Sequence, residues 1–192
     1  MQMEEAMRHV AIALGLALLP ASAVAQIGNP AGMAPDTKME ASGKPAPNQT
    51  NYQDRLFAQL ASGGGMAEVE FGRLAAERAG NSRVKEFAQR MVEDHGKAND
   101  TLKGLADKSK IPLPVELGPD HQKQRSDLEK LEGAAFDLAY MRGQVMEHQK
   151  TVQLLAWEID SGQDAEIKQF AVATLPTVMH HLEMARNLVA EL

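Results

Sequence analysis

Four potential metal ligands stand on the apolar stripes of four amphipathic segments: Glu68, His95, His148 and His181. Burying a carboxylate or an imidazole without a partner is costly, so one such side chain in each of four segments suggests a shared purpose. Three imidazoles and a carboxylate suit zinc, copper, iron or manganese in the interior of a helical bundle. We therefore predict that these four residues bind one transition-metal ion. The residues that we expect to support them by hydrogen bonds are Asp94, Asp137, Tyr140 and Gln144.

The depth of each ligand in a bundle follows from counting residues back to the nearest predicted turn. Glu68 and His95 lie about 12 and 15 residues from the first turn, which places them nearly level at ~1.5 Å per residue. His148 and His181 lie about 14 and 19 residues from the second turn. The second pair is therefore offset by several ångströms, and a single shared site needs the kink that Pro176 imposes.

Two alternatives to this site stay open. In the first, the histidines form a structural network without a metal, bonded to neighbours such as Glu147 and the supporting residues above. In the second, thioethers take part, because Met91 precedes His95 by four residues and His180 precedes Met184 by four. Side chains at this spacing share a helix face, and such a set suits Cu(I).

Apolar residues recur at steps of three and four from about residue 54 to the C-terminus, which predicts helices throughout. The prolines and glycine of residues 109–119 exclude a helix there, and 11 extended residues can reach roughly 36–40 Å, the length of a long helix. Three consecutive glycines at 63–65 predict a break or a close helix contact. The fold class is all-α: an antiparallel four-helix bundle with an extra short helix before the third long one. The predicted helices are 54–79, 82–108, 120–132, 133–161 and 164–192.

The N-terminal part of the chain predicts export. Residues 1–25 resemble a signal peptide, with the apolar run 10–19, Pro20 and small residues before a cleavage point after Ala25. Residues 26–51 have hardly any large apolar side chain and form a tether, and residues 52–192 form the bundle. The apolar run is too short to cross a bilayer. We therefore expect a periplasmic or secreted protein with no transmembrane span in the mature chain.

Composition and motifs exclude several classes of function. The formal net charge of −6 argues against a nucleic-acid partner, which needs a basic surface. The chain has no cysteine, so it has no disulfide, thiolate ligand or cysteine nucleophile. No phosphate-binding glycine loop, nucleophile elbow or zinc-protease motif is present.

Four stretches carry a family resemblance: AEVEFGRLA at 67–75, FAQRMVEDH at 87–95, GAAFDLAY at 133–140 and LPTVMHHLE at 175–183. Over residues 52–192 the chain resembles the bacterial family called domain of unknown function 4142, DUF4142. The resemblance implies a ferritin-like four-helix bundle in a periplasmic or outer-membrane setting. The family has no agreed biochemical activity, so its name implies a fold more than a function.

One departure from ferritin-like chemistry argues against an enzyme. Di-iron bundles use Glu-x-x-His pairs, but Val92, Val145 and Val178 stand three residues before the three histidines. We therefore predict no catalytic residues and a role in envelope homeostasis or stress protection, with one transition-metal ion in the core. The alternative is a structural or protein-interaction module without metal, which engages another envelope protein.

Overall fold

The structure, a computed structural model, describes residues 51–192, and these form five α-helices and no strand. The predicted signal peptide and all but the last residue of the predicted tether lie outside the described residues. No helix in the described part of the chain has the length and apolarity to cross a bilayer. The helices are α1 (Tyr52–Arg78), α2 (Ser82–Lys108), α3 (Pro119–Leu128), α4 (Gly133–Ser161) and α5 (Ala165–Glu191).

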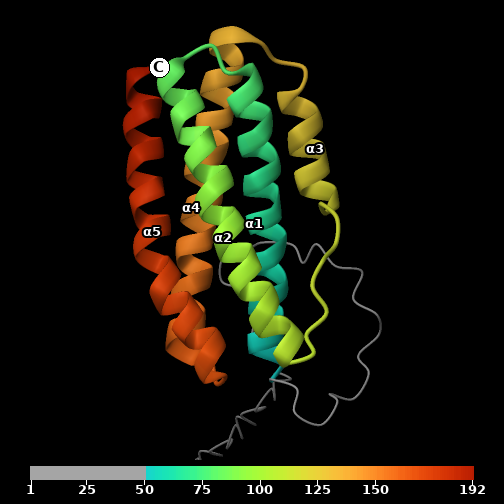
Figure 1. Ribbon diagram of the computed structural model, residues 1–192. Helices are drawn as coiled ribbons and strands as arrows, with labels where there is room; N and C mark the ends of the chain where they lie inside the picture. The colour runs from blue at the N-terminus through green and yellow to red at the C-terminus, as the bar shows by residue number, and fades with distance from the viewer. Residues whose placement is uncertain (1–50) are drawn as a thin grey trace, which may run out of the picture.

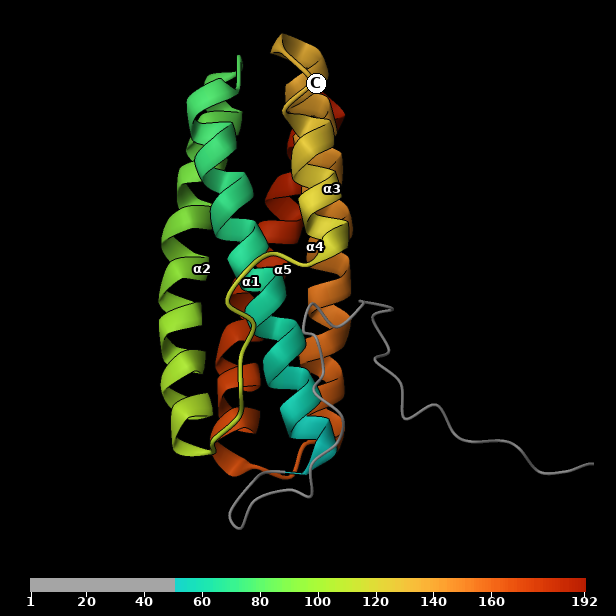
Figure 2. The ribbon, with the colours of Figure 1, turned by 90° about the vertical axis from the view of Figure 1, so that its right-hand side faces the viewer.

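The four long helices form two hairpins, α1 with α2 and α4 with α5, which pack side by side (Figure 1). Helix α1 contacts α4, and α2 contacts α5, so each helix lies between two antiparallel neighbours. After α2, the segment 109–118 and α3 run back along the outside of the bundle to its other end (Figure 2). Because of this crossover α2 and α4 run in the same direction, as in ferritin-like bundles. The predicted fold class is confirmed.

Side chains that bond the first free amide groups fix where several helices begin. Asn51 caps α1, Asn81 caps α2 and Asp164 caps α5. The observed bounds of α2 and α4 are those predicted from the sequence. The bounds of α1 and α5 differ from the predicted ones by one or two residues, and the short helix differs most, since α3 ends at Leu128 rather than at residue 132. The guanidinium group of Arg78 donates to the carbonyl oxygens of residues 129 and 131 at 2.8 and 3.2 Å, which holds this segment in a non-helical course.

The three glycines of α1 do not break the helix, and one of them, Gly65, lies in close contact with α2. Helix α1 continues through residues 63–65, and a Cβ atom on Gly65 would overlap the side-chain amide of Asn99 on α2. Helix α5 also continues through Pro176, and its lower part turns away from the direction of its upper part (Figure 1). The glycine at 65 lets α1 and α2 approach closely, and the change of direction in α5 alters the path of that helix along the core.

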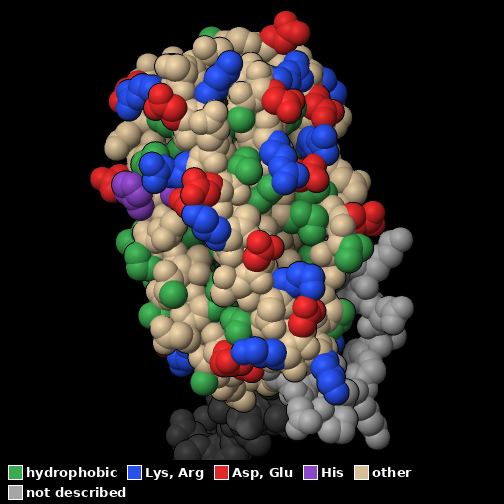
Figure 3. Space-filling view, viewed as in Figure 1, with side chains coloured by type: hydrophobic (Ala, Val, Ile, Leu, Met, Phe, Trp, Pro, Cys, Tyr) green, Lys and Arg blue, Asp and Glu red, His purple; other side chains and the backbone are tan. Residues whose placement is uncertain are grey.

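The apolar core has two parts, with a polar layer between them. One cluster includes Met91 and Met141 and lies toward the α1–α2 turn, and the other includes Leu102 and Leu154 and lies toward the α4–α5 turn. Along α2 and α4 the histidines fall between these residues, so they occupy the middle of the bundle. The surface seen in Figure 3 carries Lys and Arg side chains mixed with Asp and Glu.

Candidate metal centre

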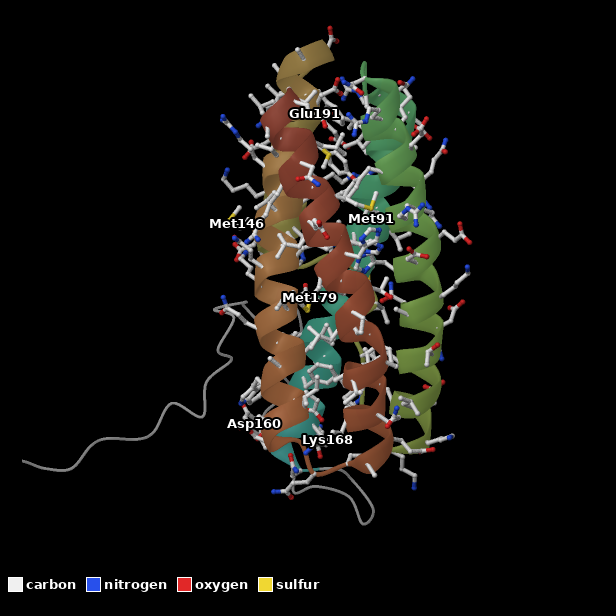
Figure 4. The ribbon with its side chains drawn as sticks, turned by 90° about the vertical axis from the view of Figure 1, so that its left-hand side faces the viewer. Met91, Met146, Asp160, Lys168, Met179 and Glu191 are labelled. Carbon is white, nitrogen blue, oxygen red and sulfur yellow. The ribbon has the colours of Figure 1, made fainter. Side chains whose placement is uncertain are left out.

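Three imidazoles from three helices converge in the middle of the bundle. His95 on α2, His148 on α4 and His181 on α5 each offer one nitrogen, and these nitrogens lie within 4.8 Å of one another. The Nε2 atoms of His95 and His148 are 3.4 Å apart. All three side chains are buried. Met91, one turn before His95 on α2, is also buried, and its side chain points into the bundle (Figure 4).

Hydrogen bonds fix which nitrogen of two of these imidazoles carries the proton. His148 Nδ1 lies 2.9 Å from the backbone oxygen of Gln144, which can only accept, so Nδ1 is the donor. The lone pair of His148 is then on Nε2, which faces His95. His181 Nε2 lies 3.0 Å from Oδ2 of Asp94 and donates to it. This leaves the lone pair of His181 on Nδ1, which is buried and has no hydrogen-bond partner. Metal-binding histidines commonly have this arrangement, with one nitrogen held by an acceptor and the other free.

The one pair of nitrogens in direct contact has the spacing expected around a metal ion. With metal–nitrogen bonds of about 2.0–2.1 Å and tetrahedral angles, neighbouring nitrogens stand about 3.3–3.4 Å apart. The observed 3.4 Å between the Nε2 atoms of His95 and His148 matches this edge. A hydrogen bond between these two nitrogens would need a proton on His95 Nε2, because His148 Nε2 carries a lone pair and can only accept.

Burial keeps the three imidazoles neutral. It lowers the pKa of His95 well below its usual value, and the neighbouring histidines lower it further. Burial also lowers the pKa of His148 to about 4, although its bond to the Gln144 carbonyl acts in the opposite direction. The pKa of His181 is lowered by burial as well, against the influence of Asp94. Neutral imidazole is the form that binds metal ions, so the group is ready to bind without losing protons near pH 7.

Glu68 lies behind His148 rather than among the converging nitrogens. Its Oε2 accepts a hydrogen bond of 2.7 Å from the side-chain amide of Gln144, and its Oε1 lies 3.8 Å from His148 Nδ1. It therefore stands on the side of the ring opposite to Nε2. Burial raises the pKa of Glu68 to about 8, so the carboxyl group is largely protonated at neutral pH. A neutral carboxyl group behind the ring supports His148 but is not placed as the fourth ligand that the sequence predicted.

Of the four residues expected to support the ligands, Asp94 and Gln144 accept hydrogen bonds from histidines of the group. Asp137 does not, because its carboxylate accepts hydrogen bonds from the backbone amides of Gly80 at 3.0 Å and Asn81 at 2.8 Å. It thereby closes the α1–α2 turn, where exposed amides need an acceptor. The sequence prediction for Asp137 was wrong.

Tyr140 and its surroundings form a second polar region on the α1–α3–α4 side. Its hydroxyl is buried without a hydrogen-bond partner, and burial followed by the nearby Glu68 raises its pKa. Further out, His121 Nε2 of α3 lies 3.8 Å from Oε2 of Glu147, and Lys150 donates to the other oxygen of that carboxylate. The sequence analysis missed His121, since α3 has no apolar seam that would make a histidine stand out.

The group of three histidines borders a groove on one side of the bundle. A groove of about 830 Å³ lies between α2 and α5, and His95, His181 and Asp94 line one end of it. His148 is not part of its lining. Two of the three histidines therefore form part of the wall of this groove.

Comparisons with known proteins agree with the fold. The family described as domain of unknown function DUF4142 matches residues 39–188. No curated protein matches the chain. Among solved structures, a DUF305 fragment from Deinococcus radiodurans has a TM-score of 0.67 at 14% identity, over 75% of this chain and 99% of its own. A DUF305 protein from Streptomyces coelicolor, described as a putative secreted protein, has a TM-score of 0.64 at 16% identity, over 72% of this chain and 91% of its own. CopM in the Cu(II)-bound form has a TM-score of 0.61 at 14% identity, over 72% of this chain and 96% of its own. At these identities the structures support the helical-bundle fold alone.

Proposed function

We propose that this chain, which belongs to the DUF4142 family, is an exported helical-bundle protein that binds one transition-metal ion through His95, His148 and His181. Such a protein would hold or buffer the metal in the cell envelope, in homeostasis or stress protection. Export is supported by the leader-like residues 1–25 and by the secreted description of one structural neighbour.

The observation that carries the proposal is the convergence of three buried imidazoles. Each brings one nitrogen within 4.8 Å of the others, and Gln144 and Asp94 each accept a hydrogen bond from one nitrogen of His148 and of His181. The Nδ1 atom of His181 is buried without a protein partner, and the Nε2 atoms of His95 and His148 contact each other. A metal ion would satisfy all of them at once. The ion would supply Lewis acidity and positive charge, while the chain fixes the three ligands and keeps most water away.

The donor set favours copper or zinc over iron or manganese. Imidazole nitrogen suits both of these metals, and copper binds such sites more tightly than the other divalent metals of its row. Manganese prefers oxygen ligands, which this group lacks, and the Glu-x-x-His pairs of di-iron bundles are absent from the sequence. Copper is the first candidate because CopM, which shares the fold, is described in a Cu(II)-bound form.

The test is metal analysis of the mature protein purified without a metal-affinity tag. We expect one metal ion per chain and loss of tight binding in His95→Ala, His148→Ala and His181→Ala. His180→Ala is the matched control, because this histidine neighbours His181 on the same helix but is exposed. Competition with chelators of known affinity would rank copper against zinc. No stoichiometric metal, or equal affinity in all four variants, would end the proposal.

A second candidate is a structural or protein-interaction module without metal, whose partner would be another envelope protein. The contact between the Nε2 atoms of His95 and His148 supports it, since a proton on His95 would make this a hydrogen bond. In that case His95→Leu should fold and be as stable as the wild type or more so, because apolar packing often replaces a buried polar network without loss. In the metal proposal, the same variant loses its metal and the stability that the metal supplies.

A further inference from the structure

We propose that the metal centre has an open coordination position facing the α2–α5 groove, and that this position takes the anionic head of a ligand whose apolar tail lies in the groove. A medium-chain carboxylate is the simplest ligand of this chemistry. The inference rests on the proposed function and specifies what the bound metal would hold.

The open position follows from the three-histidine donor set. Metal ions of this kind take four or more ligands, and a site with three protein ligands leaves a position for an outside molecule. Glu68 cannot fill this position in the observed arrangement, since it lies behind His148. The groove reaches the site from the side of His95 and His181, so an outside ligand would enter from there.

The charge at this end of the groove favours an anion. A divalent ion held by three neutral imidazoles keeps its full positive charge. The only carboxylate at this end of the groove, Asp94, accepts a hydrogen bond from His181 and compensates one charge at most. A carboxylate head would compensate the second charge and supply an oxygen donor. Glu166 lines the distant end of the groove, where it pairs with Lys108.

The walls beyond the histidines suit an apolar tail. On α2 the groove extends from Asp94 to Leu105, which is about 16 Å at the rise of a helix. Thr101 adds no strong polarity, because its hydroxyl donates to its own helix at the Lys97 carbonyl, 3.0 Å away. Gln169, Thr174 and Thr177 of α5 also line the groove. The apolar side chains that line it are Ala98, Leu105, Ala165, Phe170, Ala173 and Val178.

A chain-length series tests both parts of the inference. Cobalt(II) replaces the native metal as a probe, since its visible spectrum responds to a change in coordination, and the loaded protein is titrated with acetate, butanoate, hexanoate and octanoate. Burial of a methylene group contributes about 0.8 kcal/mol, so we expect affinity to rise about fourfold for each methylene that enters the groove. Ala173→Trp should fill the groove and remove this dependence on length. Val172→Trp is the matched control, because Val172 is exposed on the same helix and does not line the groove.

Each outcome bears on a separate claim. Tight cobalt binding with no spectral response to any carboxylate would show a closed centre and overturn the inference, with the proposed function intact. A response to acetate that does not grow with chain length, or that grows equally in Ala173→Trp, would overturn the role of the groove. Absence of cobalt binding would overturn the proposed function itself, and the inference with it.

Discussion

Asp94 offers the sharpest test of how the protein prepares its ligands. It contacts no metal in the proposed site, yet its Oδ2 lies 3.0 Å from His181 Nε2 and keeps the proton on that nitrogen. In Asp94→Ala the imidazole is free to move its proton to Nδ1, the nitrogen that must offer its lone pair. Loss of such an acceptor typically lowers metal affinity by about 10–100-fold, which corresponds to about 1.4–2.7 kcal/mol.

A second substitution separates the two contributions of Asp94. Asp94→Asn keeps an oxygen that can accept from Nε2 but removes the negative charge, so we expect a loss between those of the wild type and Asp94→Ala. The matched control is Glu93→Ala, since Glu93 is the exposed neighbour whose carboxylate bonds Lys97 rather than a histidine. Removing this exposed ion pair should leave metal affinity unchanged.

The assay is competition between the protein and a chromophoric chelator, with copper and zinc in separate titrations. Thermal unfolding of each metal-free variant provides the control for folding, because the lost hydrogen bond should cost only about 0.5–1.5 kcal/mol of stability. The reasoning is refuted if metal-free Asp94→Ala is folded and its metal affinity equals that of the Glu93→Ala variant. Equal affinity would mean that the orientation of His181 does not depend on Asp94.

Three further predictions concern the bundle as a whole. Burial, followed by the nearby Asp54, raises the pKa of Glu158 to about 8, and both of its carboxyl oxygens are buried without a donor. The folded state therefore keeps a proton that the unfolded state releases near pH 4.5, so the stability of the protein should fall as pH rises from about 4.5 to 8. The variant Glu158→Gln has no such proton to lose. Thermal unfolding should show it about 1–2 kcal/mol more stable than the wild type at pH 8 and equal to it at pH 4. Gly72→Ala should destabilise the protein by about 1–3 kcal/mol in denaturant unfolding, because the new Cβ would lie 2.9 Å from the Ala88 carbonyl oxygen. Gly104→Ala is the contrast, since its new Cβ would meet nothing within 4 Å and should stabilise α2 by about 0.5–1 kcal/mol. Removing the metal with a chelator should lower the melting temperature of the wild type and leave that of His148→Ala unchanged; equal shifts in both would show that the chelator acts elsewhere.

Apolar periodicity predicted the helices well because packing and periodicity have the same physical cause. A helix that buries one stripe must repeat its apolar residues at steps of three and four residues. The first and last residues of α2 and α4 could therefore be predicted from the sequence. The histidines were found for the same reason, since each interrupts such a stripe. Counting residues gave their depth only approximately, because it takes the helices as straight and parallel. Helix α5, which contains Pro176, is bent (Figure 1).

The direction of each side chain around the bundle axis could not be predicted in this way. Glu68 and Asp137 both lie on inward stripes, but one points behind His148 and the other into the α1–α2 turn. Which neighbour a buried carboxylate meets depends on how the hairpins are placed side by side, and no single helix contains that information. The α2–α5 groove was missed for the same reason, since it arises from contacts between segments far apart in the sequence.

The polar layer is best explained by a bound ligand. Apolar side chains at this depth would join the two halves of the core by packing, but three imidazoles and a carboxyl group stand there instead. Only part of their hydrogen-bonding capacity is satisfied, and the free nitrogen of His181 is the clearest deficit. A fold selected for stability alone would gain by replacing these side chains with leucine or valine. Retaining them is favourable if a ligand returns the lost interactions. The His95→Leu variant tests this point: a binding site requires that the variant loses the metal that the wild type binds, while it is at least as stable as the wild type stripped of metal.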